Sequence, residues 1–212
     1  MPQVTVMRHS IRLDSDPNAI IARTFDTPLS QEGINLALNT NIPGVKRVIS
    51  SPLLRCVHTA VLVHGKCSLD DNALSFTPGE VIIDNRVREV WNRRVLGAPI
   101  DQVTMLNNDE LQRETYLELN LTRTDHAIPD VEESRGTNGD ADLRFKAAIQ
   151  AIAEENSDID HILIVSHGDA IGAMANMVSK EIYEANFCCH ITLEYKDNAW
   201  TYVASNGVGF LS

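Results

Sequence analysis

The sequence has little positive charge and no long apolar segment. No apolar run approaches the roughly 18 residues needed to cross a bilayer. The residues around Pro2 and Gln3 lack the basic stretch and long apolar core of a secretory signal, so we expect a cytoplasmic protein. Lys and Arg number 18 against 29 Asp and Glu, which gives a net charge of −11. This deficit argues against nonspecific binding to nucleic acid or to an anionic membrane.

Cysteine is also scarce, and the four cysteines follow no CxxC pattern of a zinc or redox site. Cys188 and Cys189 are adjacent, and adjacent cysteines rarely form a disulfide for geometric reasons. Successive strand residues point to opposite faces, so Cys188-Cys189-His190 would not converge on a metal ion. We therefore expect free thiols in a reducing compartment and no bound metal or cofactor.

The charge is unevenly distributed along the chain. Residues 1–100 carry 11 basic and 9 acidic side chains, whereas residues 101–212 carry 7 basic and 20 acidic ones. Any site that needs positive charge must therefore draw mainly on the first half of the chain.

What is present is typical of a globular protein: 212 residues, 43% of them hydrophobic, are enough for one domain with its own core. Strand-like and helix-like patterns alternate, which predicts an α/β fold, a three-layer α/β/α sandwich with a mostly parallel central sheet. We expect strands at about 4–7, 45–49, 81–83, 161–165, 188–195 and 200–204, and helices at about 31–38, 51–64, 107–119, 140–155 and 169–179. Residues 1–212 are expected to form a single domain, in which an insertion at about 97–140 roofs the candidate site.

Two histidines follow predicted parallel strands. Arg8-His9 follows the first strand, and Ser166-His167-Gly168 follows the strand at 161–165. Ligands of open α/β sheets bind beyond the carboxyl ends of the strands, so we expect both histidines to face one crevice. After the second strand, Ser51 is a candidate N-cap, Pro52 a first helical residue, and Arg55 lies in the first turn. Helix N-termini and guanidinium groups both suit phosphate oxygens.

Five segments together resemble the histidine phosphatase, or phosphoglycerate-mutase-like, superfamily: Met-Arg-His at 7–9, Asp-Thr-Pro-Leu-Ser-Gln-Glu-Gly at 26–33, Ser-Ser-Pro-Leu-Leu-Arg-Cys-Val-His-Thr-Ala at 50–60, Arg-Glu-Val-Trp at 88–91 and Val-Ser-His-Gly at 165–168. They occur in the family's order and extend over about 160 of the 212 residues. Within the superfamily, residues 8–14 and 55–60 are most similar to the branch that contains the suppressors of T-cell-receptor signalling and the ecdysteroid-phosphate phosphatases.

The resemblance implies roles for particular residues. His9 matches the nucleophile, Glu89 the acid/base, and Arg8, Arg55 and a protonated His167 the phosphate-binding groups. The branch resemblance adds Arg12 to the phosphate contacts, although a loop arginine is equally able to pair with a neighbouring aspartate. Ser10 replaces the family's usual glycine and is a candidate pocket residue, since its hydroxyl would add a hydrogen bond and its side chain restricts φ.

Elementary chemistry agrees with these roles. A neutral imidazole is a competent nucleophile near pH 7, and His9 would need a backbone carbonyl to fix its tautomer. Glu89 would need a raised pKa to hold a proton near neutrality. Val90 and Trp91 supply an apolar setting that favours this, whereas the neighbouring arginines oppose it.

The sequence thus predicts a metal-independent phosphatase that hydrolyses a phosphate monoester, on a small molecule or a phosphoprotein, through a phosphohistidine. Two alternatives stay open. A phosphoglycerate mutase would use the same pocket, but the mutases' glycine, small polar residue and asparagine after Arg-His are replaced by Ser10-Ile11-Arg12. A catalytically inactive phosphate-recognition module is the other. The oligomeric state, with a homodimer as one possibility, is not indicated by the sequence.

Overall fold

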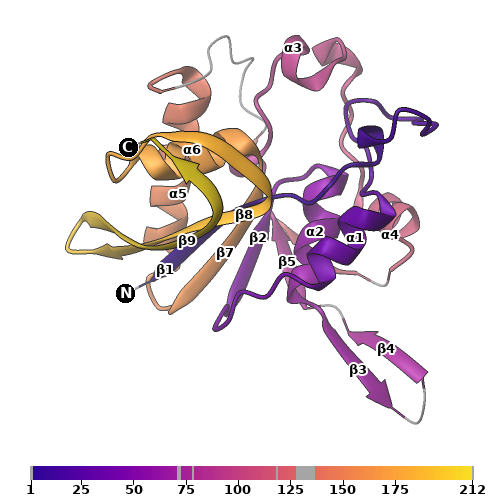
Figure 1. Cartoon of the computed structure of the whole chain (residues 1–212), viewed down its shortest axis with the longest axis horizontal. Helices are drawn as coiled ribbons and strands as arrows, with labels where there is room; N and C mark the ends of the chain where they lie inside the picture. Colours follow the sequence, from indigo (N-terminus) through magenta and orange to yellow (C-terminus); the bar gives the residue numbers. More distant parts are fainter. Residues whose placement is uncertain (1, 71–72, 78, 118, 128–136, 212) are drawn as a thin grey trace.

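A single mixed sheet organises the molecule. The computed structural model describes residues 2–70, 73–77, 79–117, 119–127 and 137–211. Within these residues, seven strands form one sheet in the order β6-β5-β2-β7-β1-β8-β9 (Figure 1). Their bounds are β1 (Gln3–Arg8), β2 (Arg47–Ser50), β5 (Glu80–Ile83), β6 (Asn120–Arg123), β7 (His161–Ser166), β8 (Ile182–Lys196) and β9 (Ala199–Phe210). The first five strands of that order are parallel; β8 is antiparallel to β1, and β9 to β8.

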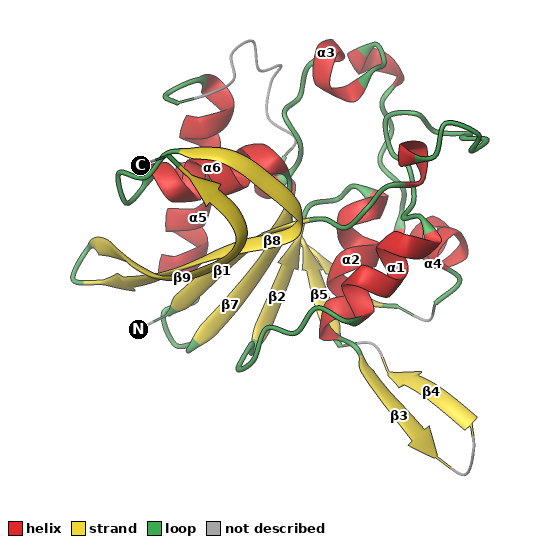
Figure 2. Ribbon diagram, in the orientation of Figure 1, coloured by secondary structure: helices red, strands yellow, loops and turns green. Residues whose placement is uncertain are grey.

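Helices cover both faces of this sheet, and the predicted three-layer α/β/α architecture is confirmed (Figure 2). One face packs against α5 and α6, and the other against α2 and α4, with α1 lying on α2. The helices are α1 (Gln31–Leu38), α2 (Leu54–His64), α3 (Arg93–Leu96), α4 (Asn108–Thr115), α5 (Asp140–Glu155) and α6 (Gly168–Asn176). Short 3-10 helices lie at η1 (Leu13–Ser15), η2 (Asn85–Val87) and η3 (Ile100–Gln102).

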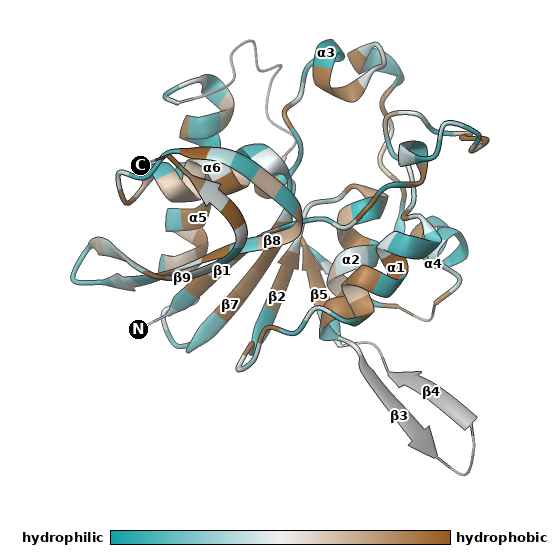
Figure 3. Ribbon diagram, viewed as in Figure 1, coloured by the Kyte–Doolittle hydropathy of each residue, from teal (hydrophilic) through white to brown (hydrophobic). Residues whose placement is uncertain are grey.

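The central strand β7 explains why both faces need cover. Ile162 and Ile164 pack into the core beneath α5 and α6, while Leu163 and Val165 pack into the core beneath α2. A strand that is apolar on both faces is typical of a parallel sheet between two helical layers. The central strands are accordingly hydrophobic over most of their length (Figure 3). Among the described residues, no helix has the length and apolarity needed to cross a membrane.

The N-caps of α1 and α2 can be compared with the two caps predicted from the sequence. Ser30 caps α1 as predicted, since its hydroxyl accepts a hydrogen bond from Gly33 N at 3.0 Å. The predicted cap of α2 by Ser51 and Pro52 is wrong. This helix begins at Leu54, whose N–H donates to the Asp26 carboxylate at 2.7 Å. The side chain of Ser51 is used elsewhere, because its hydroxyl contacts His167.

Some elements differ from the predicted ones. No strands were expected between α2 and β5, yet β3 (Lys66–Asp70) and β4 (Ala73–Thr77) form a hairpin that projects from the sheet (Figure 1). Residues 97–140 contribute α4 and also β6, which extends the sheet edge by pairing with β5. Strands β8 and β9 are longer than predicted, and Asp197 and Asn198 form the expected turn between them.

Candidate active site

The predicted histidines meet at the carboxyl ends of β1, β7 and β2. Arg8 is in register with Ser166, and His9 N donates to Ser166 O at 2.9 Å. His9 and His167, each one residue beyond its strand, therefore lie side by side, with ring centroids 5.5 Å apart and ring planes at 66°. Both rings are buried. The two strand-end histidines, expected at one sheet edge, are therefore adjacent.

The geometry of His9 defines its tautomer. Its Nδ1 lies 2.8 Å from the carbonyl oxygen of Ser10, which can only accept, so Nδ1 carries the hydrogen and Nε2 keeps its lone pair. Burial lowers the pKa of His9 well below its usual value, and the charge of Arg55 lowers it further. His9 is thus a neutral imidazole with an available lone pair at pH 7.

His167 is held between a hydroxyl and a carboxylate. Its Nδ1 lies 3.1 Å from Glu89 Oε2, and its Nε2 lies 2.8 Å from Ser51 Oγ. Burial lowers the pKa of His167, an effect that the carboxylate of Glu89 opposes. The contacts fit a neutral ring that donates from Nδ1 to Glu89 and accepts from Ser51.

Glu89 connects the two sides of the crevice. Its Oε2 also accepts from Arg55 Nη2 at 3.3 Å, and its Oε1 accepts from Val90 N at 3.0 Å. Burial tends to raise the pKa of Glu89, but His167, Arg55 and the Val90 N–H outweigh it and hold the pKa well below the usual value. The raised pKa that an acid would need is therefore absent: in the free protein Glu89 is an ionised carboxylate.

The two arginines reach the crevice from different elements. Arg55, in the first turn of α2, is buried, and its Nη1 donates to Phe25 O at 3.3 Å. Arg8, at the end of β1, donates from Nη1 to Ala185 O. The Nε atoms of Arg8 and Arg55 are buried and have no hydrogen-bond partner among the described residues. Buried guanidinium N–H groups left unpaired in a crevice are suited to an anion.

The two weaker candidates are engaged with their own neighbours. Arg12 forms an ion pair with Asp14, one of the alternatives that the sequence left open. It also lies near Arg8: burial lowers the pKa of Arg8, and the charge of Arg12 lowers it further. Ser10 is buried, and its hydroxyl donates to Gly33 O at 2.7 Å. Its backbone N–H donates to Thr59 Oγ1 at 3.0 Å. In this arrangement Ser10 connects the His9 loop to α1 and α2.

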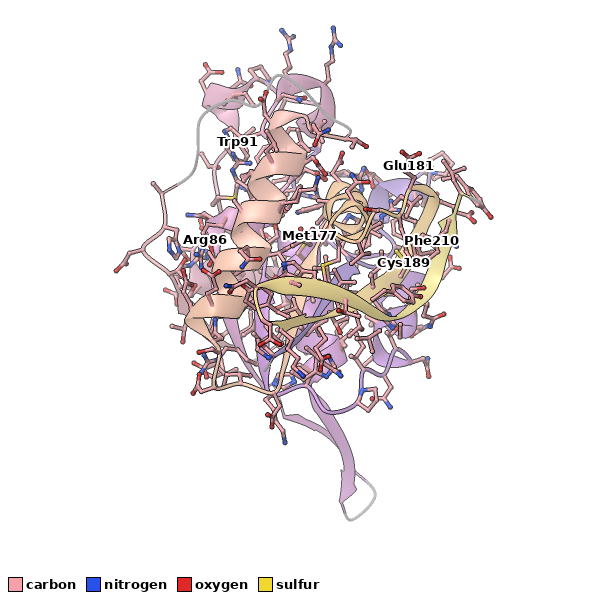
Figure 4. All side chains as sticks on the ribbon, turned by 90° about the vertical axis from the view of Figure 1, so that its left-hand side faces the viewer. Arg86, Trp91, Met177, Glu181, Cys189 and Phe210 are labelled. Carbon is pink, nitrogen blue, oxygen red and sulfur yellow. The ribbon has the colours of Figure 1, made fainter. Side chains whose placement is uncertain are left out.

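A pocket of about 540 Å³ adjoins Arg8. Its walls come from α6 and the first residues of β8, and the acidic residues that line it are Asp142, Asp169, Glu181 and Glu184. Glu181 lies at the outer end of the ribbon formed by β8 and β9 (Figure 4). Asp142 is paired with Lys146 at 2.7 Å, and the four carboxylates outnumber Arg8 in the lining. The pocket beside the arginines is therefore acidic.

Comparison with known proteins identifies the family. The model of the histidine phosphatase superfamily (branch 1) matches residues 4–207 of this chain. The chain belongs to this superfamily. The family prediction made from the five segments is confirmed. A search of curated proteins finds no sequence that matches this chain.

Solved structures of the same fold agree with this assignment. The ecdysone phosphate phosphatase from Bombix mori has a TM-score of 0.64 and 19% identity, covering 96% of this chain and 92% of that one. A phosphoserine phosphatase from Entamoeba histolytica has a TM-score of 0.56 and 16% identity over 97% of both chains. The alpha-ribazole phosphatase from Shigella flexneri has a TM-score of 0.53 and 19% identity, covering 95% and 94%.

Three contacts around the candidate site were missed or misread from sequence. Ser51 was read as a helix cap but contacts His167. Asp26, the first residue of the segment 26–33, caps α2 and lies 3.9 Å from Arg55, which steadies both the helix and the arginine. Cys56 follows Arg55, and its sulfur lies 3.5 Å from His167 Nε2. An aspartate such as Asp26 is a recognisable N-cap candidate in the sequence, but only the fold shows that it caps α2 and not the helix that follows it in the chain, α1.

The remaining sequence expectations concern thiols and metals. Cys56, Cys188 and Cys189 are free and buried, as predicted, while the side chain of Cys67 lies outside those described. In the described part of the chain, no group of three or more His, Cys, Asp or Glu side chains is arranged to hold a metal ion.

Proposed function

We propose that this protein is a metal-independent phosphatase that hydrolyses phosphate monoesters through a phosphohistidine intermediate on His9. The observation that carries the proposal is the hydrogen bond from His9 Nδ1 to Ser10 O, which leaves the Nε2 lone pair available beside two arginines. Hydrolysis, rather than another use of the same site, is supported by the similar structures, which are described as phosphatases.

In the first step, the Nε2 lone pair of His9 attacks phosphorus, a P–N bond forms, and the bond from phosphorus to the leaving oxygen breaks. That oxygen must gain a proton. Glu89 is ionised in the free protein, but a phosphate dianion placed beside it would repel its charge and raise its pKa. Substrate binding itself would then favour a protonated Glu89, which donates to the leaving oxygen.

In the second step, water attacks the phosphohistidine, the P–N bond breaks, and inorganic phosphate leaves. The carboxylate that Glu89 regained by donating its proton accepts one from the attacking water. His167, hydrogen-bonded to Glu89 at 3.1 Å, keeps this carboxylate directed at the crevice.

Charge for the transferred group comes from the chain itself. Phosphoryl transfer depends mainly on electrostatic support for the equatorial oxygens. Arg8 and Arg55 present buried, unpaired N–H groups, and His167 becomes a further donor when it is protonated. Arg12 would join them if its pairing with Asp14 opened. These groups supply the positive charge that a metal provides in other phosphatases.

The substrate that we propose is a bulky phosphate ester, and a phosphotyrosyl protein is one example. Its leaving group would lie in the pocket beside Arg8 and contact the insertion at about 97–140. The pocket's acidic lining opposes the mutase alternative, because the carboxylate of a phosphoglycerate would face Glu181 and Glu184. We place the activity in the cytoplasm, where the free thiols are stable.

Replacing His9 by alanine tests the proposal. His9→Ala should abolish release of phosphate from an aryl phosphate, while His126→Ala, which removes a half-exposed imidazole elsewhere, should retain it. Rapid quenching of the wild-type protein should trap an acid-labile phosphoprotein that His9→Ala does not form, with or without EDTA. Turnover by His9→Ala would overturn the phosphohistidine, and conversion of 3-phosphoglycerate to 2-phosphoglycerate would establish the mutase instead.

A further inference from the structure

Strand β8 is irregular where it passes the candidate site. Its pairing with β9 runs from Ala185 opposite Val208 to His190 opposite Asn206. Four residues of β8, 186–189, thus face one residue of β9, Gly207, and we call these four residues the β8 bulge. A bulge of this kind redirects side chains that a regular strand would place on alternate faces.

Specific backbone conformations on both strands accommodate the β8 bulge. Cys188 adopts a left-handed φ of 56°, and Gly207 opposite it has φ of 67°. A Cβ at Gly207 would lie 3.1 Å from the Cβ of Cys189, so the glycine allows the two strands to approach. Cys188 N also donates to His9 O at 3.4 Å, which connects the bulge to the nucleophile's own backbone.

The bulge directs Phe187 toward two residues of the site. The guanidinium carbon of Arg8 lies 4.2 Å from the centroid of the Phe187 ring. The ring of His9 lies 5.9 Å from the same centroid, at an angle of 46°. Phe187 is half-buried, and its ring packs against both groups.

These contacts occupy one face and one nitrogen of the Arg8 guanidinium group. Its face is covered by Phe187, and its Nη1 donates to Ala185 O, so β8 holds the group in two directions. The edge formed by Nε and Nη2 is left over, and its buried Nε has no partner among the described residues. That edge is turned toward the start of α6, since a Cβ at Gly168 would lie 3.9 Å from Nε. Two parallel N–H groups on one guanidinium edge match two oxygens of a phosphate.

We propose that Phe187 is a positioning residue that holds Arg8 so that its Nε–Nη2 edge faces the phosphoryl oxygens. The inference rests on the proposed function, because it takes the ligand of that edge to be the phosphate group. Phe187 acts through a cation–π contact with a partly desolvated guanidinium, a kind of contact that corresponds to about tenfold in affinity. It contributes no atom to the reaction.

The test separates the aromatic ring from mere bulk. Phe187→Leu keeps an apolar side chain but removes the ring, whereas Phe187→Tyr keeps the ring. Affinity for inorganic phosphate, measured by calorimetry and as competitive inhibition, should fall about tenfold in Phe187→Leu and less than about twofold in Phe187→Tyr. With an aryl phosphate, Phe187→Leu should raise KM by a similar factor and lower kcat less.

Tyr202→Leu is the matched control, because Tyr202 stacks with Lys180, 4.8 Å from its ring centroid, on the same ribbon. It should leave phosphate affinity unchanged. Equal affinities in Phe187→Leu and the wild type, or equal losses in the Leu and Tyr variants, would overturn the positioning role. Calorimetry reads binding without turnover, so a wild-type protein that binds phosphate but hydrolyses nothing would refute the proposed function while this role is still measured.

Discussion

The two sides of the crevice are built differently. The inner side is buried: His9 and His167 lie at the ends of β1 and β7, and Arg55 reaches them from the first turn of α2. The outer side, formed by α6 and the irregular start of β8, is more exposed and acidic. The groups proposed for chemistry thus lie just beyond the regular part of the sheet, and the surface that would meet the rest of the substrate lies where the sheet is irregular.

This difference separates the residues that should determine the reaction rate from those that should determine substrate preference. Substitutions on the inner side alter groups that have no alternative partner, so we expect large losses of rate. Substitutions on the outer side alter an accessible surface, so we expect smaller changes that depend on the substrate.

After the loss of all turnover in His9→Ala, the next largest effect should come from Glu89→Gln. An amide keeps the size and can accept from Arg55, but it neither donates the acidic proton nor accepts one from water. We expect kcat for an aryl phosphate to fall about 10²- to 10⁴-fold, the range typical of general acid–base groups. Steady-state kinetics measure this. An alkyl phosphate, with a poorer leaving group, should suffer more than the aryl ester; an equal loss for both would mean that Glu89 does not protonate the leaving group.

The pH dependence should show an intermediate effect. Protonation removes the lone pair of His9, so kcat/KM falls as pH drops through the pKa of His9. Because burial and Arg55 lower that pKa well below its usual value, the acid limb should lie below pH 6.5, the pKa of a free imidazole. A full pH profile of kcat/KM measures this.

Asp26 supplies the control for that profile. Burial raises the pKa of Asp26 to about 6, although Arg55 opposes the shift. Asp26→Asn removes this titration and leaves His9 in place. The acid limb should keep its position in the variant. If the limb disappears, it reports the titration of Asp26, and the positioning of Arg55 by Asp26, not the protonation of His9, limits the rate at low pH.

The smallest effect should come from the outer side. Glu184→Lys reverses one charge of the acidic pocket, so the ratio of kcat/KM for a carboxylate-bearing phosphate ester to that for a neutral ester should rise a few-fold at low salt. Glu194→Lys, ten residues farther along β8, makes the same charge change away from the pocket. If both variants shift the ratio equally, net charge rather than the pocket determines the preference.

The same contrast separates what the sequence could and could not predict. Arg8, His9 and His167 follow strands whose apolar pattern is local, so their meeting at one sheet edge was predictable. Phe187 was not, because its position depends on the unequal pairing of β8 with β9, which no local pattern records. Ser51 was misread because a serine before a proline fits a helix cap, while its actual partner, His167, is 116 residues away.

The secondary structure was likewise predictable only where the sequence pattern is local. Apolar runs with clear breaks predicted β1, β7 and α5 closely. Strand β6 was missed because its side chains are mostly exposed at the sheet edge and lack an apolar pattern. The ionisation of Glu89 was also beyond local reasoning, since it depends on Arg55 and His167 from two other elements.

The sulfur of Cys56 gives the site a further property. This thiol lies against His167, and burial raises its pKa to about 12, although the charge of Arg55 opposes the shift. A thiol that stays protonated is a poor target for peroxide and for alkylating agents, which react with thiolates. In the proposed mechanism the reacting atom is nitrogen, and the Cys56 sulfur beside His167 stays protonated, so we expect activity to survive oxidants that inactivate thiolate-dependent enzymes.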